Sequence, residues 1–196
     1  MKVHPIEEES YRILAERLDL SAMAPLGRAV VARVAHATAD LHLARSMVVD
    51  EDALGRAVRA LRAGVPVVTD VEMVAAGVSG VATSCFLPQV GPGARPTRSA
   101  AAMRLAADAH PTGALIVVGC APTALAEVVA LAGRGALDPL LVVGMPVGFV
   151  GAAEAKAALQ VSGLAAVTNV GERGGSAAAA AVVNALVRLA KGEERG

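Results

Sequence analysis

The segment from Leu140 to Lys156, with the sequence LLVVGMPVGFVGAAEAK, restricts the fold of this chain more than any other stretch. It begins with a run of Leu and Val, which is typical of a strand that is covered on both faces in a parallel sheet. Gly144, Gly148 and Gly151 then allow a sharp turn, and the Ala-rich end of the segment favours a helix. Such a strand-turn-helix unit places a loop and a helix N-terminus at the carboxyl edge of a sheet, where open α/β folds bind ligands.

Four more apolar runs have the length of buried strands, and segments with helical spacing separate them. The five predicted strands cover residues 65–69, 81–86, 114–119, 140–143 and 164–168. Because strands alternate with helices, we predict a three-layer α/β fold with a doubly wound sheet of about five mainly parallel strands. A chain of 196 residues can bury a substantial core, and one domain covering residues 1–196 is expected.

The composition limits what fills this core and which partners are expected. Aromatic residues make up only 2% of the chain and apolar residues 55%, so Ala, Val and Leu must pack closely, with further burial in an oligomer. The 18 basic and 18 acidic residues balance, so no overall charge attracts nucleic acid or a membrane surface. No basic stripe with interleaved aromatic residues is present, and nucleic-acid binding is not expected.

The sequence also predicts a soluble protein of the cytoplasm. The N-terminal MKVHPIEEES is acidic and lacks the apolar region of a signal peptide. Pro122 and Glu127 interrupt the apolar stretch 114–133, which a strand followed by a helix explains better than a membrane span. Cys85 and Cys120 form no CxxC motif, so we expect two buried, unpaired thiols and neither a zinc site nor a redox pair.

Among the four histidines, His36 is the best candidate for a proton donor near neutral pH. It is predicted to lie near the end of a helix that starts at Pro25. Arg33 precedes it by three residues, so both side chains can share one helical face. The residues alone favour a structural histidine over a catalytic one. Ser10 lies in a predicted amphipathic helix over 7–18, and its sequence context gives it no role.

A segment rich in Pro and Gly, from Pro88 to Arg98, is predicted to form a lid or a disordered connector. Ser99 is expected to cap the helix that follows. Arg98 would then lie beside the positive end of that helix and form a small anion pocket. A capped helix with an exposed arginine explains the same pattern.

The ends of the predicted strands carry the remaining polar candidates. Asp70 follows the strand 65–69 and is either a catalytic acid or the cap of a short helix. Three other strand ends carry turns rich in glycine or hydroxyl groups, and these form a rim of N–H donors suited to a ligand with several carboxylates or phosphates. Neither a Walker motif nor GxGxxG is present, so a nucleotide site has little support.

Seven motifs, spread in order from the first helix to the last, resemble those of the precorrin-8X (cobalt-precorrin-8) methylmutases of cobalamin biosynthesis. They are HPIEEESYRIL, RVAHATAD, TDVEMVAAGVS, TRSAAAM, GCAPTAL, GMPVGFVGAAEAK and RGGSAAAAAVVNAL. The resemblance covers nearly the whole chain, and GMPVGFVGAAEAK is too long to match by chance.

The resemblance implies an isomerase that moves a methyl group from C-11 to C-12 of a corrin precursor, a polycarboxylate, by an acid-assisted 1,5-sigmatropic shift. The product would be hydrogenobyrinic acid or its cobalt form, cobyrinate, and no cofactor or protein-bound metal is implied. A flavodoxin-like fold and a homodimer with active sites near the interface are also implied. By resemblance, His36 is the catalytic acid, and Ser10, Arg33, Ser79 and Arg98 contact the substrate.

The chain departs from the family pattern at three positions. Ala39 stands where glycine is usual, and Pro96 and Cys120 stand where asparagine is expected. These changes are expected to shift the loop after His36, to stiffen the loop before Arg98 and to remove a polar side chain from a strand end. Two other functions stay open: a non-catalytic tetrapyrrole carrier on the same scaffold, and a phosphate- or nucleotide-binding α/β enzyme. Retention of His36 argues against the carrier.

Overall fold

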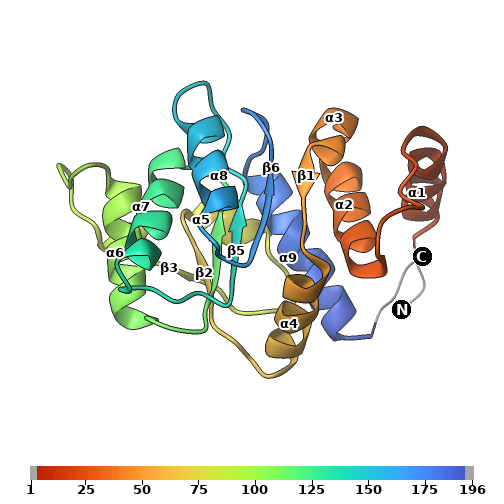
Figure 1. Cartoon of the computed structure of the whole chain (residues 1–196). Coiled ribbons are helices and arrows are strands. Elements are labelled where there is room, and N and C mark those ends of the chain that lie inside the picture. Colours follow the sequence, from red (N-terminus) through yellow and green to blue (C-terminus); the bar gives the residue numbers. More distant parts are fainter. Residues whose placement is uncertain (1–3, 193–196) are drawn as a thin grey trace.

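The structure is a computed structural model that describes residues 4–192, with a six-stranded sheet at its centre (Figure 1). The strand order is β1-β6-β5-β4-β2-β3. The strands are β1 (Met47–Val48), β2 (Val67–Thr69), β3 (Ser84–Cys85), β4 (Leu115–Val118), β5 (Leu141–Gly144) and β6 (Ala166–Asn169). Strands β2 to β6 run parallel to one another, and only β1 is antiparallel, with Met47 opposite Asn169. The predicted α/β fold with a mainly parallel sheet is confirmed, while the edge strand β1 was not predicted.

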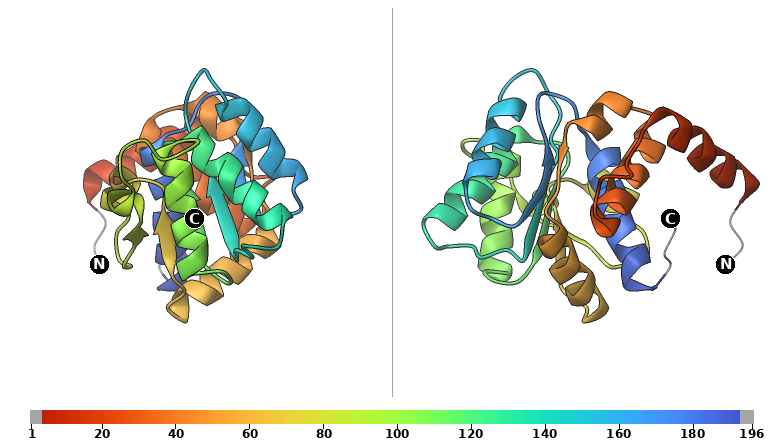
Figure 2. Two further views of the ribbon diagram at one scale, coloured as in Figure 1. Left: turned by 90° about the vertical axis from the view of Figure 1, so that its left-hand side faces the viewer. Right: turned by 45° about the vertical axis from the view of Figure 1, so that its right-hand side comes forward.

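Helices cover both faces of the sheet, as Figures 1 and 2 show. The helices are α1 (Pro5–Arg17), α2 (Pro25–Thr38), α3 (Leu41–Arg45), α4 (Glu51–Arg62), α5 (Glu72–Gly77), the 3-10 helix η1 (Leu87–Gln89), α6 (Arg98–Ala109), α7 (Pro122–Gly133), α8 (Ala152–Val161) and α9 (Ser176–Ala190). Helices α2, α4, α5 and α9 pack on one face, and α6, α7 and α8 pack on the other. Helix α1 lies outside α2, on the side away from the sheet (Figure 2).

Side chains of the central strands alternate between these two layers, as the geometry of a strand requires. In β4, Leu115 and Val117 face α9, whereas Ile116 and Val118 face α6 and α7. Gly119 follows β4 where a Cβ atom would lie 2.8 Å from Cβ of Ala179. The predicted close contact between helices and sheet is therefore present, and it depends on small residues at the strand ends.

Two local predictions were wrong. Cys120 is exposed and Cys85 is half-buried, although both are unpaired as predicted. Because β4 ends at Val118, Cys120 lies in the turn beyond the strand rather than inside it. Thr97, not Ser99, caps α6, because its hydroxyl oxygen accepts a hydrogen bond from the Ala100 N–H. Within residues 4–192, no helix combines the length and the apolar character needed to cross a membrane.

Candidate functional site

The imidazole of His36, in the last turn of α2, is held by two consecutive residues of α1. The ring stacks on Tyr11, with ring centroids 4.7 Å apart and an interplanar angle of 8°. The Ser10 hydroxyl oxygen is 2.8 Å from Nδ1 of His36. When the hydroxyl donates this hydrogen bond, a neutral imidazole carries its proton on Nε2. Helix α1 therefore fixes both the plane of the ring and the environment of one of its nitrogens.

His36 faces a small pocket between α1 and α2. The cavity has a volume of about 160 Å³ and is lined by Ser10, Ile13, Leu14, Arg17, Ala35, His36, Ala39 and Leu41. Its wall is mainly apolar, with Ser10, Arg17 and His36 as the polar groups. Sites that enclose a whole drug-sized ligand measure about 300–1,000 Å³, so this pocket has room for only part of a ligand of that size.

Arg33 lies one turn before His36 on the same side of α2, as the three-residue spacing predicts. Its Nη1 is 3.6 Å from Oε1 of Glu7 in α1, and the same oxygen accepts a hydrogen bond of 3.0 Å from Nη1 of Arg188. The Nε atom of Arg33 is buried and has no hydrogen-bond partner among the described residues. A buried donor without a partner is costly, and an acceptor supplied by a ligand would remove that cost.

Ala39 ends α2 at the edge of the His36 pocket and adopts the left-handed conformation, with φ 52° and ψ 22°. This conformation costs an L-residue about 1–2 kcal/mol, whereas glycine adopts it freely but loses about 0.5–1 kcal/mol more than alanine through backbone entropy. We therefore expect Ala39→Gly to raise the free energy of unfolding by about 0.5–1 kcal/mol, measured by urea denaturation.

Ala37→Gly is the matched control, because Ala37 is exposed and helical in the same turn. It should lower the free energy of unfolding by about 1 kcal/mol. A loss of stability in Ala39→Gly similar to that in the control would contradict the assignment of strain to Ala39.

Ser79, a predicted substrate contact, lies just after α5 and does not line the His36 pocket. Its N–H and hydroxyl both donate to Oδ1 of Asn184 on α9, at 2.8 and 3.2 Å. Arg188, which contacts Glu7, is one turn further along α9. Ser79 therefore belongs to the same layer of helices as His36, but α9 separates it from the α1–α2 pocket.

Arg98 is the first residue of α6, on the opposite face of the sheet. Its Nε donates to the Val90 carbonyl at 3.1 Å, and its Nη2 donates to the Leu87 carbonyl at 3.2 Å. The segment from Pro88 to Arg98 is thus tied to the start of α6 by Arg98 and to the core by the buried side chain of Val90, which does not fit a disordered connector. The anion pocket predicted at this helix end is occupied by carbonyl oxygens of the chain itself.

The side chain of Asp70 binds the turn after β4, which is one of the three turns rich in glycine or hydroxyl groups. Its carboxylate accepts hydrogen bonds from the N–H groups of Gly119, Cys120 and Ala121, at 3.1, 2.9 and 2.8 Å. Burial raises the pKa of Asp70, although these three donors oppose the shift. Asp70 does not cap α5, which has no side-chain cap, and its carboxylate takes the N–H groups of the three residues that precede Pro122 at the start of α7.

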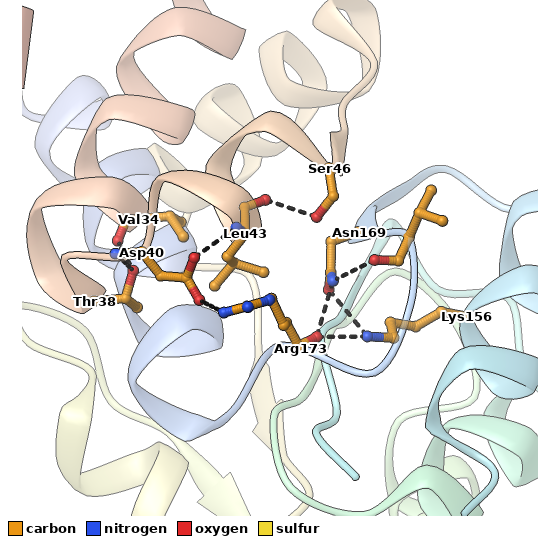
Figure 3. A network of polar contacts seen from close by, with 9 residues as sticks. Val34, Thr38, Asp40, Leu43, Ser46, Lys156, Asn169 and Arg173 are labelled. Carbon is orange, nitrogen blue, oxygen red and sulfur yellow. Dashed lines mark hydrogen bonds and ion pairs between the residues drawn. The ribbon is translucent and has the colours of Figure 1, made fainter. Parts of the chain in front are cut away.

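The turns after β5 and β6 meet at the carboxyl edge of the sheet, next to the end of α2. The Gly148 N–H donates to the Glu172 carbonyl, and the Gly175 N–H donates to the Met145 carbonyl. Arg173 pairs with Asp40, which lies four residues after His36 (Figure 3). This edge therefore carries both His36 and the Gly-rich segments that were predicted to bind a ligand.

One residue at this edge was missed by the sequence analysis. Lys156 is fully buried on α8, and its Nζ contacts the loop after β6. The sequence does contain a pattern that indicates burial of Lys156. This residue shares the helical spacing of Ala152, Ala155 and Leu159, which are all buried. A lone lysine on the apolar stripe of an Ala-rich helix indicates an internal polar contact.

Comparison with known proteins links the chain to one family. The family model CbiC, described as precorrin-8X methylmutase, matches residues 5–189. A cobalt-precorrin-8 methylmutase of Methanothermobacter thermautotrophicus is 38% identical, over 97% of this chain and 95% of that protein. A precorrin-8X methylmutase of a Sinorhizobium species is 37% identical, over 93% of each chain. A crystal structure of precorrin-8X methyl mutase from Thermus thermophilus has a TM-score of 0.85 and 34% identity, covering 97% of this chain and 99% of that one.

Proposed function

The chain belongs to the precorrin-8X methylmutase family, whose members are isomerases of cobalamin biosynthesis, and we propose that it moves a methyl group from C-11 to C-12 of a corrin precursor with His36 as the acid. The observation that carries this proposal is the fixed imidazole. His36 is stacked on Tyr11, bound to Ser10 and directed into a mainly apolar pocket.

The reaction is an isomerisation that needs a proton only transiently. His36 donates a proton to a nitrogen of the conjugated ring, which draws electron density out of the ring system. The bond from the methyl group to C-11 breaks as the bond to C-12 forms, and the proton then returns to the imidazole. As the acid, His36 is an imidazolium: its Nδ1–H donates to the Ser10 hydroxyl oxygen, and its Nε2–H is the proton that is transferred and returned.

The substrate carries several carboxylates, and we assign Arg33 to one of them. The buried Nε of Arg33 without a partner supports this assignment. A guanidinium is suited to a carboxylate because its N–H groups match the spacing of the two oxygens. We keep Ser79 and Arg98 as proposed substrate contacts outside the His36 pocket. Their present partners are an amide oxygen and loop carbonyls, which a ligand could replace.

We also propose a homodimer with active sites near the subunit interface. The pocket of about 160 Å³ is too small to enclose a macrocycle, so further walls are needed. Phe149 and Val150, in the turn after β5, are 91% and 87% exposed and would be covered by a second copy. Sedimentation equilibrium measures the mass directly, and a monomer at the concentrations of the assay would contradict this part.

The function is tested by a single-turnover assay with purified protein and either the metal-free or the cobalt-loaded precursor. We expect at least one precursor to change its ultraviolet-visible spectrum to that of the product. Binding without this change would instead identify a tetrapyrrole carrier. Comparing the two rates also decides whether the substrate carries cobalt, because the metal lies in the macrocycle and belongs to the substrate.

Ser10→Ala tests the role of the hydroxyl bound to His36. A single hydrogen bond contributes about 0.5–1.5 kcal/mol, so the single-turnover rate should fall by about 2- to 13-fold. Affinity for the product should change less than the rate, because the hydroxyl acts mainly through the imidazole. Ser21→Ala, at an exposed position outside this pocket, is the control. An unchanged rate in Ser10→Ala would remove Ser10 from the mechanism.

A further inference from the structure

Lys156 is the largest fully buried side chain whose role the proposed function leaves open. Its Nζ donates to the carbonyl oxygen of Arg173 at 2.6 Å and to Oδ1 of Asn169 at 3.3 Å. Both acceptors are neutral, and burial lowers the pKa of Lys156 to about 8. A lysine is rarely buried without a carboxylate because its charge is costly to desolvate. The burial of Lys156 against two neutral acceptors therefore indicates that its ammonium group serves as a hydrogen-bond donor to Asn169 and Arg173.

The acceptors of Lys156 lie at the end of β6, at Asn169, and in the loop between β6 and α9, at Arg173. Nδ2 of Asn169 donates to the carbonyls of Arg173 and Val170, at 2.8 and 3.2 Å. The Arg173 carbonyl is thus held by two donors, one from Lys156 and one from Asn169, as Figure 3 shows. Because these two hydrogen bonds fix the backbone of Arg173, they also fix the position from which its side chain extends.

The side chain of Arg173 connects this loop to the wall of the His36 pocket. Its Nη1 pairs with Oδ2 of Asp40 (Figure 3). Oδ1 of Asp40 accepts a hydrogen bond of 2.9 Å from the Leu43 N–H, and this bond and the Arg173 guanidinium lower the pKa of Asp40. Asp40 lies between Ala39 and Leu41, and both of these residues line the pocket.

We propose that Lys156 is a positioning residue for the methyl shift: it fixes the Arg173 carbonyl, so that the Arg173 guanidinium holds Asp40 and the pocket wall beside His36. This inference rests on the proposed function of His36. A displacement of about 1 Å between reacting groups can cost a hundredfold in rate, so a contact several residues from the imidazole can control the chemistry.

If the role of Lys156 were merely structural, its substitution would have a different effect on the rate. Lys156→Met keeps an unbranched side chain of similar length but removes the donor to the Arg173 carbonyl. If Lys156 only filled the core, the folded variant would convert its substrate at the normal rate. If it positions the pocket wall, the rate of the bound complex should fall while the affinity for the product stays close to normal.

The experiment compares single-turnover rates and product dissociation constants of the full chain and of Lys156→Met. We expect the rate to fall by about 10- to 100-fold and the dissociation constant to change less than threefold. Lys191→Met, the same change at an exposed lysine, should leave both values unchanged. A normal rate in folded Lys156→Met would overturn the proposal.

Arg173→Ala keeps the test available if Lys156→Met fails to fold, because the Arg173 side chain is 58% exposed. It should also lower the rate, and combining it with Lys156→Met should add little to the larger single effect. The proposed connection between Lys156 and the pocket wall would be contradicted in two cases. The rate losses of the two single variants could multiply in the double variant, or Arg173→Ala could keep a normal rate.

A magnetic-resonance measurement separates this inference from the function. The imidazole signals of His36 should shift in Arg173→Ala and stay in place in Lys191→Met, whether or not the chain turns over a corrin. Unmoved His36 signals in Arg173→Ala would overturn the positioning role alone. Absence of methyl transfer in the unmodified chain, with the His36 signals shifted as expected, would overturn the proposed function alone.

Discussion

Replacing His36 with alanine is expected to lower the single-turnover rate of the methyl shift by about 10²–10⁴-fold, the range that a general acid contributes. The loss follows because the variant has no group at this position that can donate a proton near neutral pH. The product should still bind, because Arg33 and the apolar wall of the pocket remain. The rate is measured from the change in the ultraviolet-visible spectrum after mixing excess enzyme with the precursor.

His42→Ala is the matched control, because His42 is exposed on α3, six residues further along the chain. It should convert the precursor at the normal rate. Far-ultraviolet circular dichroism should show the same helix content in both variants, since His36 is only half-buried. A His36→Ala variant that turned over as fast as the control would show that another group supplies the proton.

Asp70→Asn is expected to lower the free energy of unfolding by about 2–4 kcal/mol, the largest effect on stability that we predict. The carboxylate accepts three hydrogen bonds from the turn after β4, at Gly119, Cys120 and Ala121. An asparagine of the same shape turns an NH₂ group toward at least one of these N–H groups and leaves that donor unsatisfied. Chemical denaturation measures the loss.

Asp108→Asn is the control, because this carboxylate is exposed on α6. Its free energy of unfolding should change by less than about 0.5 kcal/mol. Folded Asp70→Asn should keep its methyl-transfer rate, because Asp70 holds a turn and does not line the His36 pocket. A stable but inactive Asp70→Asn would restore the alternative that Asp70 is a catalytic acid.

The four inner parallel strands, β2, β4, β5 and β6, were predictable because their apolar runs are typical of strands that are covered on both faces of a parallel sheet. The edge strand β1 was not, since its two residues, Met47 and Val48, carry no pattern of their own. They form a strand because β6 offers an open edge beside them. Helix α3 was missed for a similar reason, as its five residues are held by the Asp40 cap rather than by helical periodicity.

The candidate site was only partly visible in the sequence. The spacing of Arg33 and His36 predicts a shared helical face, and both residues do face α1. The contact with Ser10 joins residues that are 26 positions apart, so only a folded chain, or the resemblance to a known family, can indicate it. The pattern of residues within one segment does not show which distant segment that segment will contact.

For Arg98 and Lys156, the contacts of the side chain depend on a loop that the local sequence pattern does not describe. The position of Arg98 at a helix start predicts an anion pocket, but the loop before it supplies carbonyl acceptors at that point. The spacing of Lys156 places it on the buried stripe of α8, but it does not identify its acceptors, which lie at the end of β6 and in the loop after it. In both cases a loop determines the outcome, and loop paths depend on contacts across the whole sheet.

The most direct test of the catalytic role of His36 is a crystal structure of the chain with its corrin product bound. The proposed mechanism predicts that an imidazole nitrogen of His36 lies about 2.6–3.2 Å from a nitrogen of the macrocycle, or reaches it through one water molecule. A macrocycle bound elsewhere on the protein, with no hydrogen-bonded path from the imidazole, would contradict the role of His36 as the proton donor.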